Sequence, residues 1–233
     1  MDFIKGEIFA VDKPYGMSSF GALAHIRYLL SHYLKHKVKI GHAGTLDPLA
    51  TGVLILCTGG ATKKIESLQY HTKEYIAGLQ LGATTASYDC EHTVNHTFPT
   101  RHITRELILE TLKQFVGDIE QVPPTYSAVK VAGERSYALR RAGEDVKLKP
   151  KNIHIESIDL LSIDLQKKTL MIKVVCGKGT YIRALARDFG KALGSGAFLT
   201  SLRRTKVGDI TIDNCVSFDH FQDWLHTINI EEK

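Results

Sequence analysis

The chain has 233 residues, of which 43% are hydrophobic and 24% charged, values ordinary for a globular protein with a sizeable core. A net charge of +5 fits a polyanionic partner without identifying one. The four cysteines lie far apart, which argues against a disulfide framework or a structural zinc site and favours a reducing compartment. The start of the chain lacks a signal peptide, and no segment approaches the roughly 18 apolar residues of a membrane span. We therefore expect a cytoplasmic protein that does not enter a membrane.

Hydrophobic periodicity predicts the elements of the first third of the chain. Ser18 or Ser19 can cap a helix whose apolar positions recur at helical spacing. Lys13-Pro14-Tyr15-Gly16 has the composition of a turn. The expected elements are a strand over 6–12, this turn, a helix that carries Phe20, Leu23, Ile26, Leu30 and Leu34, a buried strand over 51–58 and a short helix over 61–68.

The rest of the chain mixes strands and helices without a regular βαβ alternation, which predicts an α+β fold with a central mixed or antiparallel sheet. Thr104 is the expected cap of a helix that Gly117 ends. The expected elements are a strand over 75–81, a long polar loop over 83–102, this helix through Leu107, Ile108, Leu112 and Phe115, strands over 153–163 and 169–176, a helix opened by Gly179-Thr180 through Ile182, Leu185, Ala186 and Phe189, and a final helix over 218–228.

One carboxylate stands out in the segment Gly41-His42-Ala43-Gly44-Thr45-Leu46-Asp47-Pro48-Leu49-Ala50-Thr51-Gly52. Its glycines permit backbone shapes that other residues resist, and Pro48 drives Asp47 away from helical geometry. An acid on such a loop, directly before a buried strand, favours a functional role. The structural alternative is an Asx turn in which Asp47 caps its own loop.

Basic residues occur in small clusters. Each cluster by itself is typical of a solvated face, but several of them beside loops with aromatic residues favour a nucleic-acid groove. The clusters are Lys35, Lys37 and Lys39; Lys63 and Lys64; Arg140 and Arg141; Lys147, Lys149 and Lys151; and Arg203, Arg204 and Lys206.

Five separated motifs occur in an order that resembles the bacterial TruB family of tRNA pseudouridine synthases. The resemblance covers roughly residues 6–208, and it implies the pseudouridine synthase fold. The family converts one uridine in the TΨC loop of tRNA, position 55 in tRNA numbering, to pseudouridine. The motifs are Val11-Asp12-Lys13-Pro14-Tyr15-Gly16-Met17-Ser18-Ser19, the Asp47 segment, Lys73-Glu74-Tyr75, Pro123-Pro124-Thr125-Tyr126-Ser127-Ala128-Val129-Lys130 and Lys178-Gly179-Thr180-Tyr181-Ile182-Arg183.

The resemblance also implies how the chain is divided and what it binds. Residues 1–217 are the expected catalytic domain, and residues 218–233 form a short C-terminal helix or tail. Family members commonly carry a PUA-type RNA-binding domain there, so this chain resembles a short form. The expected partner is the T-arm stem-loop of tRNA, with no obligatory protein partner. The reaction needs no cofactor or metal, and the sequence has no P-loop or dinucleotide motif.

Asp47 is the candidate nucleophile, since a carboxylate can form a covalent intermediate. By resemblance it attacks ribose C1′ or uracil C6, or assists a glycal route, and the sequence does not choose among these. Asp12 is the rival acid, but its place at a strand end favours a structural salt bridge. Arg183 is the candidate partner that keeps Asp47 ionised and oriented, and its structural alternative is a surface arginine on an amphipathic helix. Tyr75 is the candidate that stacks on the base and removes the C5 proton, unless it is a core tyrosine.

The remaining candidates are substrate-binding residues. His42 is the expected wedge that fills the place of the extruded uridine, and its alternative is a loop histidine bonded to the backbone. Tyr181 is expected beside the flipped nucleotide, and Leu202 at the wall of the uracil pocket, although a lone leucine is more often core. Lys13 is expected to shape the pocket floor with Pro14, and Lys130 to contact phosphate.

Three other functions stay open on the sequence. The main alternative is an RNA-folding chaperone that opens the tRNA elbow without chemistry. A synthase guided by an H/ACA RNA is disfavoured, because that class depends on the additional C-terminal domain and on partner proteins. A hydrolase that uses Asp47 would need a positioned water and usually a second acid or a metal.

Overall fold

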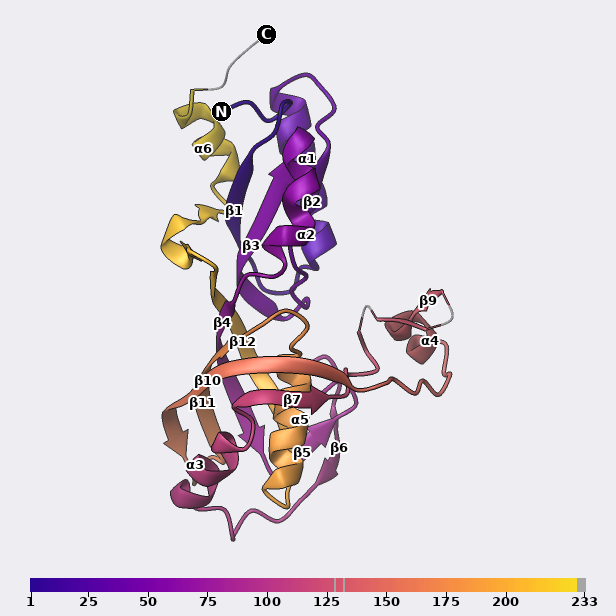
Figure 1. The fold of residues 1–233 in the computed structure, drawn as a ribbon, viewed down its shortest axis with the longest axis vertical. Helices are drawn as coiled ribbons and strands as arrows, with labels where there is room; N and C mark the ends of the chain where they lie inside the picture. Colours follow the sequence, from indigo (N-terminus) through magenta and orange to yellow (C-terminus); the bar gives the residue numbers. More distant parts are fainter. Residues whose placement is uncertain (128, 132, 230–233) are drawn as a thin grey trace. The chain divides into compact units, whose positions relative to one another are not determined.

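The computed structural model describes residues 1–127, 129–131 and 133–229, and they form two compact units (Figure 1). Unit 1 comprises residues 1–74 and the chain from 203 onward, and unit 2 comprises Tyr75–Leu202. The chain changes units inside two strands, β4 (Lys73–Leu81) and β12 (Ala197–Val207). Unit 2 is therefore one continuous stretch, whereas unit 1 is assembled from both ends of the sequence.

Unit 1 is a sheet in the order β14-β1-β3-β12, with β2 paired to β3 and β13 paired to β12. Strand β14 runs parallel to β1, while β1, β2 and β3 pair antiparallel, so the sheet is mixed. The bounds are β1 (Ile8–Lys13), α1 (Ser19–Tyr33), β2 (Ile40–His42), β3 (Ala50–Thr58), the 3-10 helix η1 (Gly59–Lys64), α2 (Ile65–Leu68), β13 (Ile210–Thr211), the 3-10 helix η2 (Ile212–Asn214), β14 (Val216–Ser217) and α6 (Phe221–Thr227).

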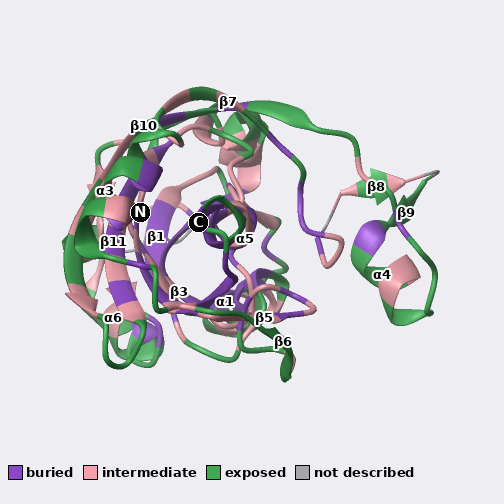
Figure 2. Ribbon diagram, turned by 90° about the horizontal axis from the view of Figure 1, so that it is seen from below, coloured by how far each residue is buried: buried purple, intermediate pink, exposed green. Residues whose placement is uncertain are grey.

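Alternation along β1 and β3 gives this sheet two apolar faces. Phe9 and Leu54 belong to the face covered by α1 and α6, and Phe9 stacks on Phe221 with ring centroids 5.8 Å apart. Ala10 and Ile55 belong to the other face, which the chain around η1, α2 and η2 covers. Figure 2 accordingly shows β1 and β3 largely in the colour of buried residues.

Unit 2 has the strand order β12-β4-β11-β10-β7, with β10 antiparallel to both β11 and β7. Helix α5 buries most of its first two turns, and α3 contacts it and β10. The bounds are β5 (Ala83–Thr85), β6 (Val94–Thr97), α3 (Arg105–Lys113), β7 (Gly117–Gln121), β8 (Lys130–Val131), β9 (Glu134–Arg135), α4 (Ser136–Arg141), β10 (Lys151–Asp164), β11 (Thr169–Cys176) and α5 (Ile182–Ala192).

Both predicted helix caps are confirmed. The Ser18 side chain accepts a hydrogen bond from the Gly21 N–H at 3.0 Å, and the Thr104 side chain accepts one from the Leu107 N–H at 3.2 Å. The mixed α+β architecture is confirmed as well. Among the described residues, no helix is long and apolar enough to span a bilayer.

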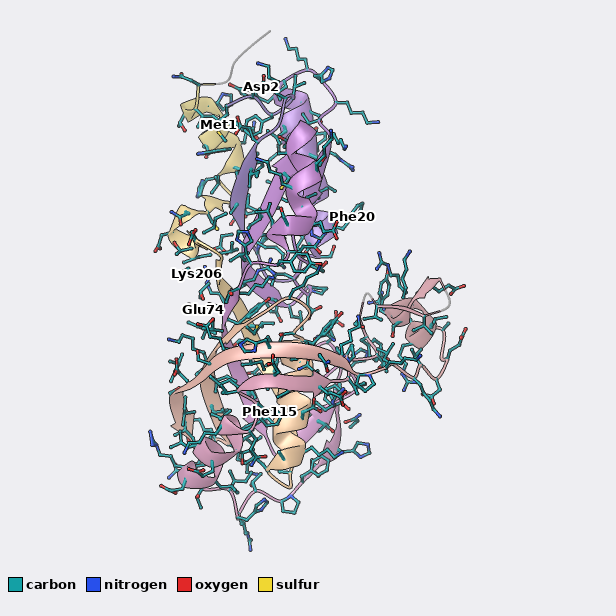
Figure 3. All side chains as sticks on the ribbon, viewed as in Figure 1. Met1, Asp2, Phe20, Glu74, Phe115 and Lys206 are labelled. Atoms are coloured by element: carbon teal, nitrogen blue, oxygen red, sulfur yellow. The ribbon has the colours of Figure 1, made fainter. Side chains whose placement is uncertain are left out.

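Two predictions about elements were wrong, one apolar position of a predicted helix is exposed, and one long strand was not predicted. The predicted loop over 83–102 contains the β5–β6 hairpin. The sequence did not indicate this hairpin, because all four residues of β6 are exposed and give no apolar alternation (Figure 2). Helix α3 ends at Lys113, and Gly117, with φ 98°, begins β7 instead of ending the helix. Phe20 projects outward from α1 and is 67% exposed (Figure 3). Strand β12 was not predicted at all.

Candidate active site

Asp47 lies in the connection between β2 and β3, and two glycines shape the backbone here, one within the connection and one near the start of β3. Gly44 and Gly52 have φ values of 102° and 107°, in the region that side chains disfavour. A Cβ atom on Gly52 would lie 2.1 Å from the carbonyl oxygen of Arg204, so only glycine fits against β12 here. Glycine at 52 therefore lets β12 approach the start of β3 closely.

The residues on either side of Asp47 are held by hydrogen bonds from other elements. The Ser19 hydroxyl accepts from the Leu46 N–H at 2.7 Å and donates to the Leu46 carbonyl at 2.9 Å. The Pro48 carbonyl accepts from the Gly16 N–H at 2.9 Å and from Lys13 Nζ at 3.3 Å. Asp47 itself is half-buried, and the backbone that carries it is fixed on both sides before any substrate binds.

Arg204 lies on β12 and holds the Asp47 loop, a role that the sequence analysis did not predict. It is 1% exposed, and it donates from Nε to the Val53 carbonyl at 2.8 Å and from Nη2 to the Gly44 carbonyl at 3.1 Å. Its neighbour Arg203 pairs with Asp12 at 2.7 Å, so the prediction that Asp12 makes a structural salt bridge is confirmed. Interpreting this basic cluster as a solvated face was wrong for Arg204.

Lys13 is fully buried, and its ammonium group donates to three backbone carbonyls. The acceptors are the oxygens of Pro14 at 2.8 Å, Met17 at 2.5 Å and Pro48 at 3.3 Å, which use all three donors of the group. Burial lowers the pKa of Lys13 to about 8, the Asp47 carboxylate opposes this shift, and Arg204 adds to it. Lys13 therefore ties the turn after β1 to the Asp47 loop while it is protonated.

We expect the turnover rate to fall as the pH rises through about 8, because Lys13 then loses its proton. Deprotonation removes one of the three donors and the positive charge beside the loop. The folded pKa lies below the ordinary value of 10.5, so the unfolded chain holds more protons between these values and this group makes stability rise with pH there. Rates measured between about pH 6.5 and 9.5 check the prediction. In Lys13→Met the rate should be low throughout, and an alkaline fall that persists in it would assign the titration to another group.

His42 ends β2, opposite Leu56 of β3. Its ring is half-buried, and burial, with a smaller contribution from Arg204, lowers the pKa of His42. Within the described part of the chain, Nδ1 is buried without a hydrogen-bond partner. The imidazole therefore favours its neutral form and keeps one ring nitrogen unused.

Arg183, in the first turn of α5, is held by three groups in unit 2. Its Nη1 donates to the Ser87 carbonyl at 3.2 Å, and its Nη2 donates to the Tyr126 carbonyl at 2.9 Å. Its Nε lies 3.5 Å from Oδ2 of Asp89, and the arginine is only 4% exposed. The surface interpretation of Arg183 is therefore excluded.

Asp89 is a further residue that sequence reasoning missed. It is 6% exposed, in the segment predicted as a polar loop, and it forms an ion pair with Arg183. Asp89 and Glu91 both lie among many polar residues, and nothing in the local sequence distinguishes Asp89. A buried arginine nearby is the only signal that could have found it, and that burial is not visible in the sequence.

The other candidates are placed as follows. Tyr75 lies on β4 and is 8% exposed, and half-buried Leu202 lies on β12. Tyr181 precedes α5, where its backbone N–H donates to Oε1 of Gln121 at 2.8 Å. Lys130 is exposed on β8, and Ala128 of the same motif lies outside the described residues. Asp47 belongs to unit 1 and Arg183 to unit 2, so their pairing stays a prediction.

Two family models match the chain. Residues 31–182 match the model described as TruB family pseudouridylate synthase (N terminal domain), and residues 183–233 match the tRNA pseudouridylate synthase B C-terminal domain. The chain is 56% identical over 234 residues to the tRNA pseudouridine synthase B of Bacteroides thetaiotaomicron, with 99% of this chain and 98% of that protein covered. It is 57% identical over 233 residues to the protein of the same name from Phocaeicola vulgatus, covering 100% and 98%.

A solved structure shares the fold. The chain is similar, with 27% identity and a TM-score of 0.70, to a chain in the crystal structure of a Cbf5-Nop10-Gar1 complex. The alignment covers 98% of this chain and 58% of that one. The fold and the two matching models define a pseudouridine synthase, which is an isomerase.

The chain belongs to the TruB family of pseudouridylate synthases. The family resemblance, the fold and the enzyme class predicted from the sequence are thereby confirmed.

Proposed function

We propose that this enzyme isomerises uridine to pseudouridine at position 55, in the TΨC loop of tRNA. The observation that carries the proposal is the Asp47 loop, whose backbone is fixed by Ser19, Lys13 and Arg204. The names of the relatives, tRNA pseudouridine synthase B, support tRNA as the substrate. The expected place of action is the cytoplasm.

Asp47 is the proposed nucleophile. The reaction breaks the N1–C1′ bond of uridine and forms a C5–C1′ bond. C5 loses a proton and N1 gains one, so the atoms balance without a redox step. A covalent bond from the carboxylate to C1′ or C6, or a glycal route assisted by Asp47, splits this change into smaller steps. A backbone held on both sides keeps the acid in one place through them.

Arg183 and Tyr75 are the proposed partners of Asp47 in catalysis. The guanidinium of Arg183 would keep the carboxylate ionised and oriented. The ring of Tyr75 would stack on the uracil, and its hydroxyl would take the C5 proton late in the reaction. The anchoring of Arg183 by Asp89 and two carbonyls supports a fixed role for that side chain.

The remaining predicted residues bind the flipped nucleotide. His42 would occupy the space of the extruded uridine, Tyr181 would hydrogen-bond beside it, and Leu202 would line the uracil pocket. Lys130 would contact phosphate, and Lys13 would act through the loop that it holds. The lowered pKa of His42, caused by burial, supports a neutral ring that can stack.

The proposed partner is the T-arm stem-loop, without an obligatory protein partner. The similar solved chain lies in a complex with Nop10 and Gar1, and that assembly is a property of that protein. We also propose that residues 1–217 carry catalysis and that the segment 218–233, of which 230–233 lie outside the described residues, has a supporting role. Phe221 and Leu225 of α6 are fully buried in unit 1, so this segment stabilises the unit that holds Asp47.

An unmodified T-arm stem-loop and an anticodon stem-loop of equal length, incubated separately with the enzyme, test the substrate. We expect pseudouridine at the single T-loop uridine and none in the anticodon arm. Equal modification of both arms would contradict the choice of substrate. Salt-sensitive binding without product, on the stem-loop and on full-length tRNA, would favour an RNA-folding chaperone instead.

A further inference from the structure

Two hydrogen bonds and an ion pair connect His92 to Arg183 inside unit 2. Nδ1 of His92 lies 3.0 Å from the Ser87 hydroxyl, which donates to Oδ1 of Asp89 at 2.5 Å. Oδ2 of the same carboxylate faces Nε of Arg183 at 3.5 Å. Ser87 is 0% exposed and Asp89 is 6% exposed, so water has little access to the two residues that lie between His92 and Arg183.

The hydrogen-bond donors in this series of contacts can be counted. A serine hydroxyl has one hydrogen, and here it points to Asp89, so its oxygen can only accept from His92. The ring of His92 must therefore carry its hydrogen on Nδ1. The Glu91 N–H also donates to Oδ1 of Asp89 at 3.0 Å. The Ser87 hydroxyl, the Glu91 N–H and the Arg183 guanidinium all present hydrogens to the carboxylate, which fixes its orientation.

His92 also contacts the second segment that holds Arg183. Its ring lies 4.7 Å from the ring of Tyr126, measured between centroids. The carbonyls of Tyr126 and Ser87 are the two that accept from the Arg183 guanidinium. One half-buried side chain thus touches both residues whose backbone anchors the arginine.

We propose that His92 is a positioning residue for Arg183, acting through Ser87, Asp89 and Tyr126. It clamps the loop after β5 against the segment before β8, and the clamp sets the direction of the guanidinium. The consequence for turnover rests on the proposed catalytic role of Arg183. The consequence for the guanidinium itself does not.

The first test observes Arg183 without any substrate. Protein labelled with ¹⁵N-arginine gives Nε–H signals, and Arg183→Lys identifies the signal of Arg183. We expect His92→Ala to shift this signal and to speed its exchange with solvent, and Ser87→Ala to do the same from the other side. His92→Asn should preserve it, because an amide N–H can donate to Ser87. His154→Ala, which removes an exposed histidine with its own 2.8 Å contact to Asp118, should change nothing.

The second test measures single-turnover pseudouridine formation and RNA affinity for the same variants. His92→Ala should lower the rate on the order of 10-fold at unchanged Kd, less than the ~100-fold that a 1 Å misplacement can cause, and His92→Asn should restore it. An unchanged Arg183 signal in His92→Ala overturns the proposal, whatever the rate and the RNA affinity are. A shifted signal with an unchanged rate upholds the positioning and overturns the catalytic role of Arg183.

Discussion

Asp47→Asn should lower pseudouridine formation by about 10⁴-fold or more and leave RNA affinity within about 3-fold of the wild type. An amide has the shape of the carboxylate but is no nucleophile at neutral pH. The bonds that fix the loop use the backbone of Leu46, Pro48 and Gly44, so they survive the change. Single-turnover assays on the T-arm stem-loop, with a parallel binding measurement, give both quantities.

The matched control is Asp209→Asn, since Asp209 is an exposed aspartate in the turn after β12. It should behave as the wild type in both measurements. Turnover by Asp47→Asn within about 10-fold of the wild type would remove Asp47 as the nucleophile. Loss of binding together with turnover would instead indicate that the side chain supports the loop.

Arg183→Lys should lower the rate by about 10²–10³-fold, although it keeps the charge. The guanidinium meets Ser87, Tyr126 and Asp89 with three different nitrogens, and a single ammonium nitrogen on a shorter stem cannot meet all three. At least one of these buried acceptors then loses its donor, so the free energy of unfolding should fall by about 2 kcal/mol. Single-turnover kinetics and urea unfolding check the two effects.

Arg187→Lys is the control on the same helix. Arg187 lies one turn further along α5, is more exposed, and pairs with its neighbour Asp188 at 2.8 Å. Its replacement should change the rate by less than about 3-fold. Equal rates for Arg183→Lys and Arg187→Lys would show that the guanidinium of Arg183 has no role in turnover.

The Asp47 loop could be predicted from the sequence because its signals are local. Glycine and proline restrict the backbone within a few residues, and the strand that follows is a continuous apolar run. The two helix caps were found for the same reason. The restrictions that mark a loop or a cap act over four residues or fewer, so one segment is enough to recognise them.

Arg204 and Asp89 could not be found because their partners lie far away in sequence. The acceptor of Arg204 Nε is 151 residues distant, and Arg183 reaches Ser87 over 96 residues. A buried arginine that donates hydrogen bonds to backbone carbonyls cannot be distinguished in the sequence from an arginine in a solvent-exposed basic cluster. Strand β12 was not predicted because two consecutive arginines break its apolar alternation. Arg204 is buried where the β12 backbone packs against Gly52, and this contact is visible only in the structure.

The division of unit 1 between the two ends of the chain has a consequence during translation. The Asp47 loop leaves the ribosome early, but Arg204 follows Val53 by 151 residues. At roughly 5–20 residues per second, this interval lasts roughly 8–30 s. Unit 2 is synthesised within that time and can fold as one uninterrupted stretch. The nascent chain therefore holds its proposed nucleophile on an incomplete loop until the segment that carries Arg204 is synthesised, so the order of synthesis delays completion of the active site.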